Sequence, residues 1–398
     1  MRTVYRIGVL LTCATAASAA SLVIVDARVY TSASAPALAR ASVVVTDGRI
    51  VAVGPKVKIP RESEIIRCGG CTVLAGFWNS HVHFTEPKWE SAASQPASKL
   101  AAQLEAMVLA SGFTTVVDTG STLADTTALR RRVESGEIAG PRIYTAGMPI
   151  FPPNGIPFYV RENMPASLLS QLAPPADAKA AVAAAQANLQ NGADIVKVFT
   201  GSWVARGKVL PMPPEIATAV VAAAHREQRL VFTHPSNLAG VEVAIASGVD
   251  VLAHAPEVTL GVDDAVLRRA VAAHMWMIPT LKLFSGDDDI ASIRAVVRRF
   301  HELGGPLLFG TDTGYLPDYD VAEEYRQLRL AGLTTADIVE MLTEAPARRF
   351  GVEKEVGRVA AGMLGDLTVL RADPAVDAGA FAQVVYTVRG GRVLHRGR

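Results

Sequence analysis

The chain has 398 residues, of which 50% are hydrophobic and 19% are charged, and its formal net charge is +1. This composition is that of a globular protein with room for one large core and a smaller second domain. No basic patch interleaved with aromatic residues and no glycine-rich phosphate motif after a strand is found, which argues against a nucleic-acid or nucleotide partner.

The first twenty residues have the pattern of an export signal. Arg2 and Arg6 form a positively charged region before a short apolar stretch, Ile7–Thr15, and Ala17-Ser18-Ala19 forms a small-residue cleavage site. We expect cleavage after Ala19 or Ala20 and a periplasmic or secreted protein, the alternatives being a frayed N-terminal strand or a membrane anchor. No other stretch offers about 20 consecutive apolar residues, so we expect no stable membrane insertion after signal removal.

β-structure is predicted at both ends of the remaining chain. The N-terminal segment contains SLVIVDARVYT and ASVVVTDGRIVAVG, with a turn at Asp47-Gly48. The C-terminal segment repeats the pattern in GDLTVLRADP and VVYTVRGGRVLHRG. Two β-rich segments at opposite ends predict one small β-sandwich, made by residues 21–73 together with residues 355–398.

Between these segments, short apolar strands alternate with alanine-rich helical stretches, which predicts an α/β fold. Eight strand–helix units in residues 74–354 match the size of one (β/α)8 TIM barrel. The predicted strands are Leu74–His83, Thr114–Thr119, Arg142–Gly147, Asp194–Phe199, Leu230–His234, Val249–His254, Met275–Thr280 and Leu307–Asp312.

Two local features add to this outline. The longest irregular stretch, Pro149–Ala176, contains seven prolines and follows the third strand, so we expect it to form a wall of the substrate site. Cys68 and Cys71 in RCGGC lie close enough for a disulfide in an oxidising compartment; free thiols and a metal site stay open as alternatives.

Metal-ligand residue types fall at the ends of predicted barrel strands. In chain order they are His81 and His83 in FWNSHVHF, His234 in LVFTHPSN, His254 in DVLAHAPE and Asp312 in PLLFGTDTG. Strand ends of a barrel face one mouth, where imidazoles and carboxylates bind Zn²⁺, Co²⁺, Fe²⁺ or Mn²⁺. Each histidine alone is more often a core residue, and the aspartate alone a helix cap, but together they predict metal-assisted hydrolysis.

Lys197 is a sharper signal because it lies inside the apolar strand GADIVKVFT. Burial lowers the pKa of a lysine, and a neutral amine reacts with CO2 to form a carbamate. The carbamate is a carboxylate-like group at the end of the long lysine side chain, and it can bridge two cations. The alternative is a buried lysine paired with a carboxylate.

These motifs resemble the amidohydrolase superfamily in its two-metal form with a carboxylated lysine. The run LTEAPARRFGVEKEVGRVAAGMLGDLTVLRADP is similar to the family's return from the barrel into a small β-sandwich. Within the superfamily the chain is most similar to dipeptidases acting on Xaa-Pro and Xaa-Arg/Lys and to imidazolonepropionase-like hydrolases. It departs in having GDL for the usual ADL, and THPSN where many members have HAHG-like residues.

The resemblance implies a role for each motif residue. One divalent metal, expected to be zinc, is held by His81, His83 and Asp312, and a second by His234 and His254. Carboxylated Lys197 bridges the two metals, as does a hydroxide that attacks the substrate. Asp312 then acts as general base and general acid, taking the proton of the hydroxide and passing it to the leaving group.

Candidates for substrate contact lie mostly in loops. Tyr159 is expected to supply a hydroxyl donor, and Arg161 suits a carboxylate, although a solvated arginine is the ordinary alternative. Trp203 is expected to wall the pocket or to pack on the barrel top, and Asn237 either contacts substrate or caps the following helix. Two further residues follow the last predicted strands, Lys282 and Tyr315.

The sequence thus predicts an exported two-metal hydrolase that cleaves a C–N bond of a small-molecule substrate, either a dipeptide or an N-acyl amino acid. The alternatives are a lactonase or cyclic amide hydrolase with the same metals, a deaminase, and a non-catalytic binding protein on the same scaffold. Whether the protein forms a homo-oligomer is left open.

Overall fold

The computed structural model describes residues 21–397. The predicted signal peptide, residues 1–20, lies outside the described residues, so cleavage and export stay predictions. Within residues 21–397, no helix combines the length and apolar character needed to cross a bilayer.

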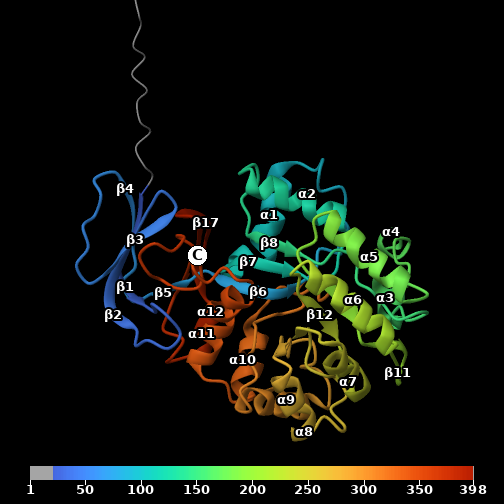
Figure 1. Ribbon diagram of the computed structural model, residues 1–398. Coiled ribbons are helices and arrows are strands. Elements are labelled where there is room, and N and C mark those ends of the chain that lie inside the picture. Colours follow the sequence, from blue (N-terminus) through green and yellow to red (C-terminus); the bar gives the residue numbers. More distant parts are fainter. Residues whose placement is uncertain (1–20, 398) are drawn as a thin grey trace, which may run out of the picture.

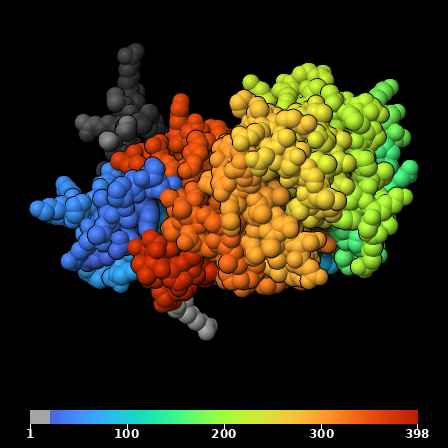
Figure 2. All heavy atoms as spheres, turned by 90° about the horizontal axis from the view of Figure 1, so that it is seen from below, coloured from blue at the N-terminus to red at the C-terminus, as the bar shows by residue number. Residues whose placement is uncertain are grey.

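Both termini contribute to one sheet. It runs in the order β17-β16-β15-β5-β1-β2-β3, and β4 pairs with β1. In Figures 1 and 2 the blue N-terminal and red C-terminal parts lie side by side at one end of the molecule. The strands are β1 (Ser21–Val29), β2 (Leu38–Thr46), β3 (Arg49–Gly54), β4 (Ser63–Arg67), β5 (Thr72–Ala75), β15 (Leu367–Leu370), β16 (Val384–Arg389) and β17 (Arg392–Arg396).

The joining of the termini agrees with the sequence, but the predicted β-sandwich is not confirmed. Hydrogen bonding connects all eight strands into a single sheet. The joint between N-terminal and C-terminal strands is the antiparallel pair β5–β15, with Leu74 opposite Thr368. Cys68 and Cys71 form a disulfide just before β5, with Cα atoms 5.4 Å apart. The domain boundaries at residues 73/74 and 354/355 stay a prediction.

Seven parallel strands form the centre of the second, α/β part. They lie in two sheets, ordered β6-β7-β8 and β14-β13-β12-β9. Their burial on both faces explains the continuous apolar character of their sequences. The strands are β6 (Phe77–Val82), β7 (Phe113–Asp118), β8 (Arg142–Thr145), β9 (Val196–Phe199), β12 (Val231–His234), β13 (Val251–Leu252) and β14 (Trp276–Met277).

The predicted eighth strand, Leu307–Asp312, is not a regular strand. Its residues make isolated backbone contacts: Leu308 N–H donates to Met277 O at 2.9 Å, and Ser80 N–H donates to Phe309 O at 2.7 Å. On the opposite side, Ile150 N–H donates to Lys197 O at 2.9 Å. These bonds join the two sheets at both ends. The domain is therefore of the TIM-barrel type, although the regular, closed eight-stranded barrel is not confirmed.

Helices surround the parallel strands (Figure 1). Several begin at an oxygen side chain that accepts a free N–H group of the first turn, as Asp263 does from Ala265 and Val266. The helices are α1 (Ala97–Met107), α2 (Leu123–Glu134), α3 (Phe158–Asn163), α4 (Ala166–Leu169), α5 (Ala178–Gln190), α6 (Pro214–Arg226), α7 (Leu238–Ser247), α8 (Asp264–Ala272), α9 (Ile290–Glu302), α10 (Ala322–Leu330), α11 (Thr335–Leu342), α12 (Glu344–Arg349) and the 3-10 helices η1 (Pro87–Trp89), η2 (Leu109–Ser111) and η3 (Ala378–Ala382).

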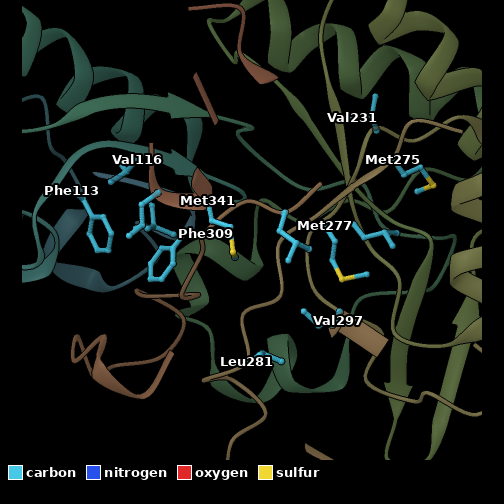
Figure 3. Packing of buried hydrophobic residues seen from close by; sticks show 14 of the residues in the cluster. Phe113, Val116, Val231, Met275, Met277, Leu281, Val297, Phe309 and Met341 are labelled. Atoms are coloured by element: carbon cyan, nitrogen blue, oxygen red, sulfur yellow. The ribbon is translucent and has the colours of Figure 1, made fainter. Parts of the chain in front are cut away.

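The largest apolar cluster lies between these helices and the strands. Figure 3 shows part of it, where Phe113 of β7 packs near Phe309 and where Met277 of β14 lies among aliphatic side chains. The Phe113 and Phe309 rings have centroids 5.8 Å apart. This packing holds the segment that precedes Asp312 in place although it lacks regular strand pairing.

Candidate metal centre

Side chains from the first and last barrel segments meet at one point. His81 lies in β6 and His83 directly follows it, and their Nε2 atoms are 3.2 Å apart. Asp312 Oδ1 lies 3.3 Å from His81 Nε2 and 3.0 Å from His83 Nε2. The Asp312 backbone is left-handed, with φ of 59°, and its N–H donates to His81 O at 3.0 Å. An aspartate held in this strained conformation indicates a site where geometry matters more than local stability.

Hydrogen bonds at the Nδ1 atoms fix which way two of the imidazoles face. His83 Nδ1 lies 2.7 Å from the Gly120 carbonyl oxygen, which only accepts, so Nδ1 carries the proton. His254 Nδ1 lies 2.6 Å from Thr280 Oγ1, and this hydroxyl donates its own hydrogen to Pro279 O at 2.9 Å. Thr280 therefore accepts from His254. In both rings Nε2 is left with a lone pair for a metal.

Lys197 lies in β9 and is 2% exposed. Its ammonium group has one distant hydrogen-bond acceptor, Ala253 O at 3.4 Å. Burial lowers the pKa of Lys197 to about 7, although the negative charge of Asp312 opposes this shift. A substantial fraction of the amine is therefore neutral at neutral pH, as carbamate formation requires.

His234 ends β12, the strand that pairs with the Lys197 strand β9. Its ring stacks on Phe199, with centroids 4.8 Å apart and planes inclined by 9°. Its Nε2 atom lies 2.8 Å from Glu257 Oε1 but lacks a partner with hydrogen-bond geometry. The His234 and His254 rings meet edge-on with centroids 4.6 Å apart.

This donor set fits divalent cations. One ligand atom each from His81, His254 and Asp312 lies within 4.8 Å of the others, and all three residues are buried. Buried atoms without a hydrogen-bond partner include His81 Nδ1, His234 Nε2 and Asp312 Oδ1. Unpaired buried acceptors are costly unless something occupies them. A cluster of neutral nitrogen donors around a carboxylate meets that need with a metal.

Electrostatics hold these donors in their ligating forms. Burial, reinforced by Lys197, lowers the pKa of His81 to about 3, so its imidazole is neutral. Burial also keeps the pKa of His254 well below its usual value. For Asp312, burial raises the pKa, but contacts with His81 and His83 outweigh it and hold the pKa well below its usual range. The result at neutral pH is a carboxylate beside the neutral imidazoles of His81 and His254. For His83, burial lowers the pKa, but the hydrogen bond and the charge of Asp312 outweigh it and raise the pKa above its usual value.

A cavity of about 250 Å³ opens over these residues. Its floor contains all six predicted metal ligands, together with Thr119, Gly120 and Ser121 of the loop after β7. One wall comes from the proline-rich stretch after β8, which holds the short helices α3 and α4. The apolar side chains that line the cavity are Met148, Pro149, Phe151, Val160, Met164, Leu168, Leu172, Phe199, Leu283 and Phe284.

Of the residues predicted to contact substrate, Tyr159 lines the cavity, whereas Arg161, Trp203 and Asn237 do not. The Arg161 guanidinium donates to the carbonyl oxygens of Ile156 and Val204, so it braces the loop. The Asn237 side chain accepts a hydrogen bond from Gly240 N–H at 3.1 Å and so caps α7, which was the alternative to substrate contact.

Trp203 lies in a hairpin that the sequence did not predict, formed by β10 (Gly201–Ala205) and β11 (Lys208–Pro211). Its indole N–H donates to Glu257, so it acts behind the cavity wall. Lys282 also stays outside, pairing with Asp318 at 3.0 Å. Tyr315 does line the cavity, with its ring centroid 5.8 Å from that of Tyr159.

Two acidic residues of the cavity, Glu257 and Asp287, were not predicted. Glu257 follows His254 by three positions, and this spacing was its only signal. A third acidic residue, Asp118, lies beneath the floor at the end of β7. It accepts from Ser121 Oγ and Thr145 Oγ1, both at 2.6 Å. Its place at the end of a predicted strand was a signal that could have drawn attention to it.

Comparisons with known proteins agree with this site. A sequence model described as the amidohydrolase family matches residues 72–394. A search of curated proteins found no match. Among solved structures, a Xaa-Pro dipeptidase with bound methionine is 22% identical with a TM-score of 0.80, covering 95% of this chain and 100% of that one.

Two further structures share the fold. A prolidase complexed with N-methylphosphonate-L-proline is 22% identical, with a TM-score of 0.76, over 95% of this chain and 100% of that one. An ochratoxinase from A. niger is 19% identical, with a TM-score of 0.75, over 94% of this chain and 96% of that one.

Proposed function

The chain belongs to the amidohydrolase family, and on that premise we propose that it is an exported, two-metal hydrolase that cleaves an amide bond in a small molecule. Family membership makes it a metal-dependent hydrolase of C–N bonds. The proposal adds two metals, export, and dipeptides or N-acyl amino acids as candidate substrates. The observation that carries it is the convergence of His81, His254 and Asp312 at the floor of a mostly apolar cavity.

The residues that would hold the metals are those at the strand ends. His81, His83 and Asp312 form one group, and His234 and His254 form the other. Lys197, once carboxylated, lies between the two groups and would contact both. Two divalent cations held there would polarise the substrate carbonyl and lower the pKa of a water molecule to about 7.

Asp312 moves the proton in this proposal. It is a carboxylate at neutral pH, because its contacts with His81 and His83 hold its pKa low. It accepts the proton that the attacking water loses and delivers it to the leaving nitrogen. Water is thus added across the C–N bond, and the products are a carboxylic acid and an amine.

Tyr159 orients the substrate. Burial raises its pKa well above its usual value, and Glu257 and Tyr315 add to the shift. The phenol therefore stays protonated and donates a hydrogen bond. Its ring lies 6.4 Å from that of His234, centroid to centroid, so its hydroxyl is close enough to serve a substrate carbonyl oxygen there. Such a donor stabilises the negative charge that develops on that oxygen.

An ester or cyclic amide could occupy the same floor, so a lactonase or cyclic amide hydrolase is the second candidate. The test is turnover of a mixed library of dipeptides, N-acyl amino acids, lactones and cyclic ureides by the zinc-loaded protein. Asp312→Asn is the control, and we expect its kcat to fall by about 10²- to 10⁴-fold. Amide cleavage that is absent in the control supports the proposal. Lactone opening alone would assign the protein to ester hydrolysis. If none of the compounds is turned over, the proposal is refuted.

A further inference from the structure

The charges that line the cavity are unevenly distributed. Apart from histidines, Lys197 is the one basic side chain among the described residues that form its wall. Carboxylation would turn that residue into an anion. Glu257 and Asp287 are acidic and lie on the wall outside the predicted ligand set. Burial raises the pKa of Asp287, and the nearby charge of Glu257 adds to the shift, so the two carboxylates influence one another.

We propose that Glu257 binds the α-ammonium group of an aminoacyl substrate, and that the cavity takes amides with a free amino group on the acyl side and an uncharged, apolar group on the leaving side. The inference rests on the proposed amide hydrolysis and replaces its candidate substrates with a more specific class. It favours aminoacyl amides over N-acyl amino acids and over dipeptides with a free carboxylate.

Glu257 is placed for this contact. Its Oε1 atom lies 2.8 Å from His234 Nε2, and its Oε2 accepts the indole N–H of Trp203. The indole holds the carboxylate from behind, while the side chain remains 20% exposed and lines the cavity. Once His234 Nε2 faces a metal, Oε1 is free for a substrate donor. A carboxylate so fixed makes a strong, charge-assisted hydrogen bond with an ammonium group.

The distance between His234 and Glu257 matches the spacing between a substrate carbonyl and its α-amino group. It is too short for a charge at the end of a long side chain. In an aminoacyl group, bonds of about 1.46 and 1.52 Å separate the amino nitrogen from the carbonyl carbon, which places them about 2.5 Å apart. When the substrate carbonyl lies next to His234, the α-amino nitrogen of the same residue therefore lies next to Glu257. A lysine or arginine side chain would carry its charge several bonds farther away.

Among the described residues, the cavity lining offers no arginine, and no lysine besides Lys197, to pair with a carboxylate on the leaving group. Arg161, the predicted carboxylate clamp, donates to backbone carbonyls outside the cavity. Lys282 pairs with Asp318 and also lies outside. The rest of the lining is mostly apolar and includes Met164 and Leu168. Burying a carboxylate against such a lining without a cation is unfavourable, whereas an apolar amine gains from it.

The rival role for Glu257 is a further metal ligand, because a carboxylate beside His234 has suitable chemistry. The two roles differ in what Glu257→Gln does. Loss of a ligand lowers the metal content, whereas loss of an ammonium partner changes the choice of substrate at unchanged metal content.

The experiment uses the full chain loaded with zinc and compares four substrates in matched pairs. Leucine anilide and N-acetyl-leucine anilide differ in the free amino group. Leucyl-phenylalaninamide and leucyl-phenylalanine differ in the free carboxylate. We expect kcat/KM to favour the first member of each pair by about 10- to 100-fold, the range of one hydrogen bond to a charged group.

In Glu257→Gln, the ratio of kcat/KM between the two anilides should fall toward one, with two zinc ions still bound per chain. Glu242→Gln is the matched control, since Glu242 lies on α7 and pairs with Arg269 at the surface. Equal rates for the two anilides, or faster cleavage of the acetylated one, would overturn the inference while leaving amide hydrolysis intact. Loss of zinc in Glu257→Gln would assign Glu257 to the metal instead. If no amide of the four is cleaved, the proposed function fails together with the inference.

Discussion

The Nδ1 atom of His254 lies 2.6 Å from the hydroxyl oxygen of Thr280, which in turn donates its hydrogen to Pro279 O. Thr280 is thus the residue that points the free nitrogen of His254 toward Asp312. Its backbone is left-handed, with φ of 45°, a conformation that β-branched residues rarely adopt. The loop after β14 therefore holds a strained residue at the point where it orients a predicted metal ligand.

Thr280→Val should weaken metal binding. Valine has the same shape but cannot accept the proton of Nδ1, so His254 loses its fixed orientation. Loss of such a partner lowers metal affinity by about 10- to 100-fold. Competition with a chelator measures the affinity. Thr280→Ser keeps the hydroxyl and should bind metal as the parent does; an equal loss in both variants would show that packing, and not the hydroxyl, is responsible.

Lys197→Ala should lose one of two metals and most of the activity, because alanine cannot form a bridging carbamate. Short carboxylic acids should restore part of the activity by placing a carboxylate in the vacated volume. Metal analysis of the dialysed protein gives the stoichiometry. Lys208→Ala is the control, since Lys208 is exposed on the hairpin of β10 and β11. Two metals and full activity in Lys197→Ala would disprove the bridge.

The pH dependence of stability should also report on Lys197. In the metal-free protein, burial lowers its pKa from 10.5 to about 7, so the folded state disfavours the charged form. Between these two pH values the unfolded chain binds one more proton, and stability rises with pH. The slope for one proton is about 1.4 kcal/mol per pH unit.

Urea unfolding in CO2-free buffer between pH 7 and 9 tests this dependence. Lys197→Met lacks the titrating group, so the wild type should gain stability relative to this variant as the pH rises. A difference between the two proteins that stays constant over this range would show that Lys197 keeps an ordinary pKa.

Removal of the Cys68–Cys71 disulfide should have a small effect. The bond closes a loop of only four residues, for which chain entropy predicts a loss of about 2 kcal/mol in the free energy of unfolding. Activity should be unchanged in Cys68→Ala/Cys71→Ala, because both residues lie in the terminal sheet region away from the cavity. Urea denaturation measures the first effect and amide turnover the second. A loss of activity at full stability would contradict this prediction.

The sequence predicted the elements whose patterns are set by burial. Thr114–Thr119 agrees closely with β7, and Leu230–His234 with β12, because parallel strands covered on both faces are apolar throughout. The prediction of the eighth strand was wrong for the same reason. Leu307–Asp312 is apolar because it packs in the core next to Phe113, yet its backbone makes only isolated contacts with its neighbours. Apolar character reports burial, and not strand pairing.

The floor of the site was easier to predict than its walls. His81 lies near the end of β6, and Asp312 ends the eighth barrel segment beside it, so the fold alone brings them together. Arg161 lies in the short helix α3, where the direction of its side chain depends on carbonyl groups from Ile156 and Val204. The unexpected hairpin that carries Trp203 depends on similar long-range packing. No local pattern records such contacts, and Glu257 escaped attention for that reason.

The pairing of β5 with β15 has a consequence for biosynthesis. β5 pairs with β1 on one side and, on the other, with residues 367–370, almost 300 positions later in the chain. Until those residues leave the ribosome, one edge of β5 has no partner, and an open edge of this kind invites pairing with other chains. The N-terminal strands therefore depend on late synthesis to become safe from aggregation. We expect a chain that is delayed in translation to expose that edge for longer.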